Sequence, residues 1–287
     1  MQIGLRYPYE EIGDDPALYA AFAQKAEQLG FKFLTFVDHV LGAEHARRDP
    51  PFEGPYHEES VFHEPMTLMA WLAAVTENID LTTSVLILPQ RQAVLVAKQA
   101  AEVQLLSRGR LRLGVGIGWN YVEYESLGVP YRNRGALLEE QVEVMRALWT
   151  ERLLDYTGRF HRIDRAGFRP WLGKPIPVWF GGFSEAQQDR CARIGDGFTF
   201  MRTSRLSRQA VQKIKTRAAA LGRDPDKLGF ETIAFSSGPE LIGDIEEWAA
   251  AGGTHIGVMT QGAGGELLDS LDTMANTLGG LLTDAER

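Results

Sequence analysis

The chain has 287 residues, of which 44% are hydrophobic and 24% are charged, so it can bury a large core and lacks the composition of a disordered protein. Its formal net charge of -8 argues against the basic surface that binds a phosphate backbone, so no nucleic-acid partner is expected. Residues 1–7 lack the pattern of a secretory signal, and no apolar stretch reaches the roughly 20 residues that cross a bilayer. We expect a soluble cytoplasmic protein without a membrane partner, and the sequence leaves a homodimer open.

Short segments rich in β-branched and aromatic residues alternate along the chain with longer segments of helical periodicity. Strands are expected at residues 2–6, 33–37, 81–88, 111–116, 178–181, 197–201, 229–235 and 255–259. Helices are expected at residues 16–29, 64–76, 93–106, 134–150, 185–194, 208–221, 239–251 and 267–281. Such alternation is typical of βα units around a parallel sheet, and roughly 250 residues is the usual length of an eightfold barrel. We therefore predict one α/β domain over residues 1–287, a (β/α)8 TIM barrel.

Two connections are too long to be simple turns. Residues 41–63 follow the second strand and are rich in Pro, Gly, His and Glu, so we expect an active-site loop over the barrel mouth. Residues 151–174 carry Tyr156, Thr157 and Gly158 between apolar segments, which predicts a small hairpin that turns near Gly158. Both are insertions within the barrel rather than separate domains.

Asp38 and His39 end the second strand, at the face where the active site of such a barrel is built. An imidazole exchanges protons near neutral pH, and a carboxylate can orient a polar ring. The alternative is a helix cap beside a surface histidine. Because adjacent residues of a strand point to opposite faces, the two side chains need not touch the same ligand. His39 is the candidate catalytic residue.

The fifth strand ends in Gly181 and Gly182, followed by Phe183, Ser184 and a predicted helix. Glycines let backbone N–H groups approach an anion, and the N-terminus of a helix adds a favourable dipole, so a phosphate fits here. The alternative is a tight turn between strand and helix. Arg202, just past the sixth strand, could supply charge to the same phosphate or remain a solvated arginine.

Three glycines within residues 114–118 end the fourth strand, but their spacing lacks the final glycine of a dinucleotide-binding turn. Small residues here can leave room for a flat ring, with Trp119 as a wall of the pocket or as a core residue. The histidines of the 41–63 loop match no metal-binding spacing, so no metal site is expected.

Taken in order, these strand ends resemble a known family. The resemblance is carried by residues 82–89, Lys98, residues 106–111 (LSRGRL), residues 114–119 (GVGIGW), Glu123, residues 148–149, residues 177–182 (PVWFGG) and residues 195–197. The chain resembles the luciferase-like monooxygenase superfamily, in particular its F420-dependent branch. The resemblance covers nearly the whole chain.

The resemblance implies a barrel that holds a flavin or deazaflavin ring at the carboxyl ends of its strands. In relatives a non-prolyl cis peptide forms a bulge behind the ring, which corresponds here to Ser84–Val85. Phosphate contacts correspond to Gly181–Gly182 and Ser184, and F420 users commonly carry an aspartate and a histidine at the positions of Asp38 and His39. The expected cofactor-binding residues are Asp38, Ser84, Val85, Ile87, Trp119, Gly181, Gly182, Phe183, Ser184 and Arg202.

One departure limits what the resemblance implies. Related sugar-phosphate dehydrogenases have an acidic residue where this chain has Trp119, so their substrate is not carried over. The leading expectation is an F420-dependent oxidoreductase that moves a hydride to or from a small organic substrate, with His39 moving the proton. The alternatives are an FMN-dependent monooxygenase that uses molecular oxygen and a barrel that binds flavin or deazaflavin without turning it over.

Overall fold

Eight parallel strands close into a barrel in the computed structural model, which describes residues 1–46, 48, 52, 54–262 and 264–282. In barrel order they are β1 (Gln2–Arg6), β2 (Phe33–Phe36), β3 (Asp80–Thr83), β5 (Leu111–Gly116), β8 (Val178–Gly181), β9 (Gly197–Phe200), β10 (Gly229–Ala234) and β11 (His255–Val258). β11 pairs with β1, with His255 beside Gln2, and this pairing closes the ring. The short β4 (Leu86–Ile87) continues the line of β3 along β5.

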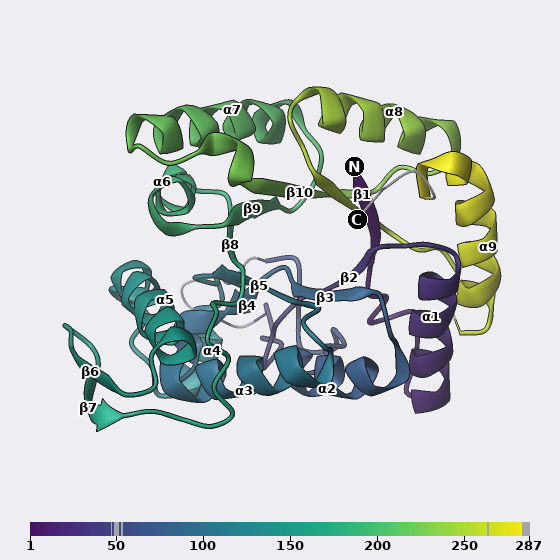
Figure 1. Ribbon diagram of the computed structural model, residues 1–287. Coiled ribbons are helices and arrows are strands. Elements are labelled where there is room, and N and C mark those ends of the chain that lie inside the picture. Colours follow the sequence, from purple (N-terminus) through teal and green to yellow (C-terminus); the bar gives the residue numbers. More distant parts are fainter. Residues whose placement is uncertain (47, 49–51, 53, 263, 283–287) are drawn as a thin grey trace.

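Helices surround the strands, as Figure 1 shows, and the predicted (β/α)8 TIM barrel is confirmed. They are α1 (Pro16–Gln28), α2 (Pro65–Val75), α3 (Ala93–Leu106), α5 (Arg134–Thr150), α6 (Glu185–Ile194), α7 (Arg205–Ala220), α8 (Gly238–Ala250) and α9 (Glu266–Leu278). Polar side chains cap the N-termini of several of these helices: Asp15 accepts a hydrogen bond from the backbone N–H of Ala17, and Glu64 accepts one from that of Thr67. No described helix has both the length and the apolar character needed to cross a membrane.

The outer helices are anchored by the apolar faces that their periodicity predicts. On α5, Val142, Met145, Leu148 and Trp149 are buried against the barrel. Each such side chain contributes roughly 1.5–3 kcal/mol when fully buried. The indole N–H of Trp149 also donates to the carbonyl of Ala97 in α3, so neighbouring helices are joined by a polar contact as well as by packing.

The amino-terminal half of the barrel interior is filled by a charged pair that the sequence did not predict. Arg112 of β5 forms an ion pair with Glu231 of β10, and both side chains are buried. The guanidinium of Arg112 lies 4.0 Å from the ring centroid of Trp179 and 5.1 Å from that of Phe33. The interior is therefore a packed core at this level, and the active site of such a barrel is built at the carboxyl ends of its strands.

The structure corrects several of the expected boundaries. The strand expected at residues 81–88 is divided into β3 and β4 with the Ser84–Val85 peptide between them, and a turn of 3-10 helix, η1 (Leu88–Gln90), follows. The last expected helix, at residues 267–281, ends at Leu278, before Gly279. A short helix absent from the expectations, α4 (Tyr121–Ser126), follows β5 and is capped by Asn120. Short helices carry too few residues for periodicity to reveal them.

The expected hairpin within residues 151–174 is present as the antiparallel strands β6 (Leu154–Thr157) and β7 (Arg162–Ala166). Figure 1 shows it projecting beyond the ring of helices. Its turn is held by the carboxylate of Glu140 on α5, which accepts hydrogen bonds from the backbone N–H groups of Arg159, Phe160 and His161. The hairpin therefore packs on an outer helix and stands apart from the barrel mouth.

Candidate active site

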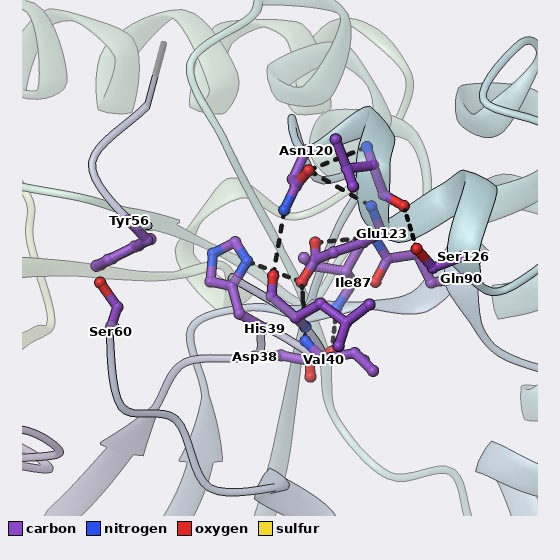
Figure 2. Close-up of polar contacts among 12 residues, drawn as sticks. Asp38, His39, Val40, Tyr56, Ser60, Ile87, Gln90, Asn120, Glu123 and Ser126 are labelled. Atoms are coloured by element: carbon purple, nitrogen blue, oxygen red, sulfur yellow. Dashed lines mark hydrogen bonds and ion pairs between the residues drawn. The ribbon is translucent and has the colours of Figure 1, made fainter. Parts of the chain in front are cut away.

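His39 and Glu123 form a hydrogen-bonded pair at the barrel mouth. His39 lies three residues beyond the end of β2, and its Nδ1 is 3.2 Å from Oε1 of Glu123 on α4. The same carboxylate accepts hydrogen bonds from the backbone N–H groups of Val40 and Leu41 and from the side-chain amide of Gln90. Figure 2 shows Glu123 pointing toward His39 and Val40. One buried carboxylate thus fixes both the imidazole and the turn that carries it.

The charge on Glu123 determines which ring nitrogen of His39 carries the proton in the neutral imidazole. Burial opposes ionisation of Glu123. The opposing effects are larger and hold the pKa of Glu123 below its usual value: a hydrogen bond and positive charge from His39, and hydrogen bonds from Gln90 and the backbone of Leu41. An ionised carboxylate only accepts hydrogen bonds, so Nδ1 of His39 carries a proton. Nε2 is then the basic nitrogen of the neutral ring, and it can exchange a proton with a ligand.

Aromatic side chains enclose the imidazole. The ring centroid of His39 lies 4.9 Å from that of Tyr56, 5.0 Å from that of Phe62 and 5.7 Å from that of Trp119. Phe52 stacks on Trp119 at 5.3 Å. Tyr56, Phe62 and Phe52 all belong to the 41–63 connection, so its described part lies over His39, where an active-site loop was expected. Only 8% of the His39 side chain is exposed.

Asp38 has a different environment from its neighbour. Its carboxylate accepts two hydrogen bonds from the guanidinium of Arg91, at 2.8 and 3.2 Å, and one from the backbone N–H of Ile87 in β4, at 2.9 Å. Asp38 is 2% exposed, and Ile87 is also buried. Arg91 in turn pairs with Glu64 at the start of α2. Asp38 therefore holds β4 and the α2 end in place beneath His39, and the direct cofactor contacts expected of Asp38 and Ile87 stay predictions.

The expected bulge in the third strand is present, and the Ser84–Val85 peptide is cis, as the resemblance implied. The hydroxyl of Ser84 lies 2.7 Å from that of Thr199 across the barrel. A Cβ atom on Gly116 would come within 2.4 Å of the Val85 side chain, and one on Gly181 within 2.5 Å. These two glycines are therefore needed to accommodate Val85, which explains small residues at the ends of β5 and β8 without a dinucleotide-binding turn.

The turn after β8 has the features that suit an anionic ligand. Gly182 has a φ of +133°, a conformation that favours glycine, and Ser184 caps α6 by accepting from the backbone N–H of Gln187. Phe183 between them is 82% exposed. Arg202, past β9, is exposed, and no described carboxylate forms an ion pair with it. Backbone N–H groups at a helix start and a nearby arginine are partners that phosphate oxygens accept.

Barrel order relates the two halves of the site. β2, which carries His39, is separated from β8, which carries the Gly181–Gly182 turn, by β3 and β5. The mouth therefore presents the His39–Glu123 pair on one side, the Ser84–Val85 bulge in the middle and the glycine turn on the other side. No group of three or more His, Cys, Asp and Glu side chains among the described residues is placed to hold a metal ion.

Sequence reasoning did not assign a role to Glu123, Gln90, Arg91 or Tyr56. One local signal pointed to Glu123: Asn120 with Glu123 three residues later is a pattern found at helix starts, and Asn120 does cap α4. The other contacts join residues that are far apart in the chain, such as Asp38 and Arg91. No periodicity or spacing within one segment could reveal them.

An eight-stranded barrel with an imidazole–carboxylate pair at its strand ends has the arrangement of a TIM-barrel enzyme. The chain belongs to the luciferase-like monooxygenase family, whose sequence profile matches residues 2–238. It is 32% identical over 218 residues to the pyrimidine monooxygenase RutA of Allorhizobium ampelinum, covering 72% of this chain and 56% of that protein. It is 31% identical over 207 residues to the F420-dependent glucose-6-phosphate dehydrogenase of Intrasporangium calvum, covering 69% of this chain and 57% of that protein.

Solved structures share the fold at lower sequence identity. An F420-dependent secondary alcohol dehydrogenase in complex with an F420–acetone adduct superposes with a TM-score of 0.79 and 17% identity. The match covers 96% of this chain and 97% of that one. The resemblance expected from the sequence is therefore confirmed for the family and for the barrel.

Proposed function

We propose that this protein is an F420-dependent oxidoreductase that transfers a hydride between the deazaflavin and a small organic substrate. The observation that carries the proposal is the His39–Glu123 pair at the barrel mouth, with Nδ1 of His39 held by a buried carboxylate. A hydride transfer to or from a carbon–oxygen bond needs a partner that takes or gives a proton. Nε2 of His39 is a basic nitrogen in the right part of the barrel for that role.

The residues at the mouth fit such a cofactor. The bulge at Ser84–Val85 lies between the His39 side and the glycine turn, so a flat ring laid over β3 and β5 would reach both. Gly182, Ser184 and Arg202 would hold the phosphate of its tail, because they combine a helix start with an arginine that pairs with no described carboxylate. A bound deazaflavin would supply the carbon that carries the hydride.

The protein's own side chains supply the proton chemistry. Nε2 of His39 would accept the proton of a substrate hydroxyl when the substrate is oxidised, and would return it to the oxygen when a carbonyl is reduced. The negative charge of Glu123 stabilises the imidazolium formed in between, because the two groups are buried and in contact. Tyr56, Phe62 and Trp119 cover the ring and exclude water from this exchange.

An FMN-dependent monooxygenase is the second candidate, and the similarity to RutA over 72% of the chain favours it. F420 remains the first choice because F420-using relatives commonly have an aspartate and a histidine at the positions of Asp38 and His39. Two relatives at 31% and 32% identity that use different chemistry do not separate the candidates, so the choice depends on the site and on measurement.

The test is a titration of the purified protein with F420, FMN and FAD, monitored by ligand fluorescence and by calorimetry. We expect F420 to bind about tenfold more tightly than either flavin, a difference of ~1.4 kcal/mol. The F420-loaded protein is then mixed with a panel of alcohols, aldehydes and unsaturated carbonyl compounds while deazaflavin absorbance is followed. Tighter binding of FMN would favour the monooxygenase, and tight F420 binding without hydride transfer to any panel member would favour a binding protein.

A further inference from the structure

Arg6, the last residue of β1, lies in the barrel mouth. Its Nη1 is 3.5 Å from the sulfur of Met259, just past β11, and its Nη2 donates a hydrogen bond to the hydroxyl of Tyr56 at 3.1 Å. A pocket of about 10 Å³, room for roughly one water molecule, lies at the carboxyl ends of β1, β2, β3, β9 and β10 and is lined by Arg6, Thr35, Val37, Ser84, Met201, Ile233 and Phe235. A positive charge is thus built into an otherwise neutral and largely apolar pocket wall.

Arg6 differs from Arg91 and Arg112 in that no described carboxylate pairs with it. Arg91 pairs with Asp38, and Arg112 pairs with Glu231. Within the described ranges, no carboxylate lies at ion-pair distance from Arg6, and its two side-chain contacts are to neutral groups. A guanidinium keeps its charge and offers five N–H donors in a planar fork. A half-buried one with spare donors favours an anion that can accept two of them.

Tyr56 connects this charge to the proposed catalytic histidine. Its hydroxyl accepts from Arg6, and its ring centroid lies 4.9 Å from that of His39. Figure 2 shows Tyr56 on the side of His39 opposite Glu123. The guanidinium and the imidazole are therefore one side chain apart, and a ligand anchored by Arg6 would extend across Tyr56 toward Nε2 of His39.

We propose that Arg6 binds the carboxylate of the substrate, and that the substrate is a monoanionic acid with an apolar body. This inference rests on the proposed function, because it assigns a substrate class to the same site. One guanidinium balances one carboxylate, whereas a phosphate dianion would leave charge uncompensated in this pocket. Because the pocket admits only a water-sized group, a carboxylate oxygen would enter it beside Arg6, and the exposed side chains of Met201 and Phe235 at its rim would contact the hydrocarbon body outside it.

The experiment measures the discrimination between an acid and its neutral isostere. Calorimetric dissociation constants are determined for phenylacetate, 3-phenylpropanoate and octanoate, each against its amide, with F420-loaded and with cofactor-free protein. We expect the wild type to prefer at least one acid by roughly 10- to 100-fold, the value of a charge-assisted hydrogen-bond pair. Arg6→Met should abolish the preference and Arg6→Lys should keep part of it. Arg208→Met, which removes a surface arginine paired with Glu247, is the matched control and should leave it unchanged.

Equal affinity for acid and amide in all three pairs, or a preference that survives in Arg6→Met, would overturn the inference. Arg6→Lys guards against a folding defect, because it retains the charge and must melt as the wild type does. The two proposals fail separately. Loss of F420 binding with an intact acid preference would defeat only the proposed function, and F420-dependent turnover without an acid preference would defeat only the role of Arg6.

Discussion

Nδ1 of His39 and Oε1 of Glu123 are 3.2 Å apart, although 84 residues separate them in the chain. Glu123 also accepts hydrogen bonds from the backbone N–H groups of Val40 and Leu41, so the imidazole and the turn beside it share one acceptor. The orientation of His39 is therefore set by a helix that follows β5 rather than by its own strand.

Replacing His39 with alanine should lower the rate constant for hydride transfer by about 100-fold or more, the usual contribution of a positioned acid–base group. Cofactor affinity should change little, because most binding energy comes from ring burial and the phosphate tail. Single-turnover kinetics and cofactor titration measure the two effects separately. The control is His161→Ala, which alters a histidine of the β6–β7 hairpin. A transfer rate equal to that of the wild type under chemistry-limited conditions would remove His39 from the reaction.

Glu123→Gln should reduce the same rate constant by about tenfold, because the amide can still accept from the backbone N–H groups but no longer stabilises a positive imidazole. The dissociation constant for F420 should stay close to that of the wild type. The control for the loss of one negative charge is Glu102→Gln, because Glu102 is an exposed residue of α3 that pairs with Lys98. If F420 affinity fell and the transfer rate did not, Glu123 would act on the cofactor site rather than on His39.

The lowered pKa of Glu123 predicts how stability depends on pH. The unfolded chain takes up a proton at this residue near pH ~4.3, before the folded protein does, so acid favours unfolding. The stabilisation is fully present above that pH and is lost as the pH falls through the lower, folded-state value. The advantage in unfolding free energy of the wild type over Glu123→Gln should shrink as the pH falls below ~4. Urea unfolding at each pH measures it, and a pH-independent difference would contradict the assignment.

Asp38→Asn should lower the free energy of unfolding by about 2–4 kcal/mol, because it leaves the buried end of Arg91 without its carboxylate. The matched control is Asp164→Asn in the hairpin, where the pair with Arg165 is exposed and a change below ~0.5 kcal/mol is expected. Guanidinium denaturation gives both values. Equal, small effects would show that the Asp38–Arg91 contact does not support the site.

Gly182→Ala should weaken phosphate-bearing F420 more than a phosphate-free deazaflavin, because a Cβ at this turn perturbs backbone N–H groups placed for an anion. The φ of +133° is unfavourable for alanine by about 1–3 kcal/mol, so strain in the turn should also lower the affinity for both ligands to some extent. Gly128→Ala, at a φ of +68° with nothing near its Cβ, provides the control for a positive-φ substitution away from the mouth. Equal loss of affinity for the two ligands would place the phosphate elsewhere.

Local patterns in the chain were enough to predict the architecture. Alternating strand-like and helical segments placed the eight strands of the barrel, and the position of His39 after a buried strand placed it at the mouth. The glycines at the strand ends could also be identified in the sequence, but the structural reason for them could not. Gly116 and Gly181 make room for Val85, a side chain from the bulge between β3 and β4, and a sequence does not show which side chain will face a glycine.

The sequence by itself determined the eight-strand order and the candidate histidine, because hydrophobic periodicity and strand-end position are properties of single segments. Only the tertiary structure decided which charges meet. The sequence did not show that Asp38 is bound to Arg91, and Arg6, which drew no attention, has no carboxylate partner within the described part of the mouth. Charge pairing depends on distances of a few ångströms between segments that the barrel brings together, and those distances follow from how the strands close.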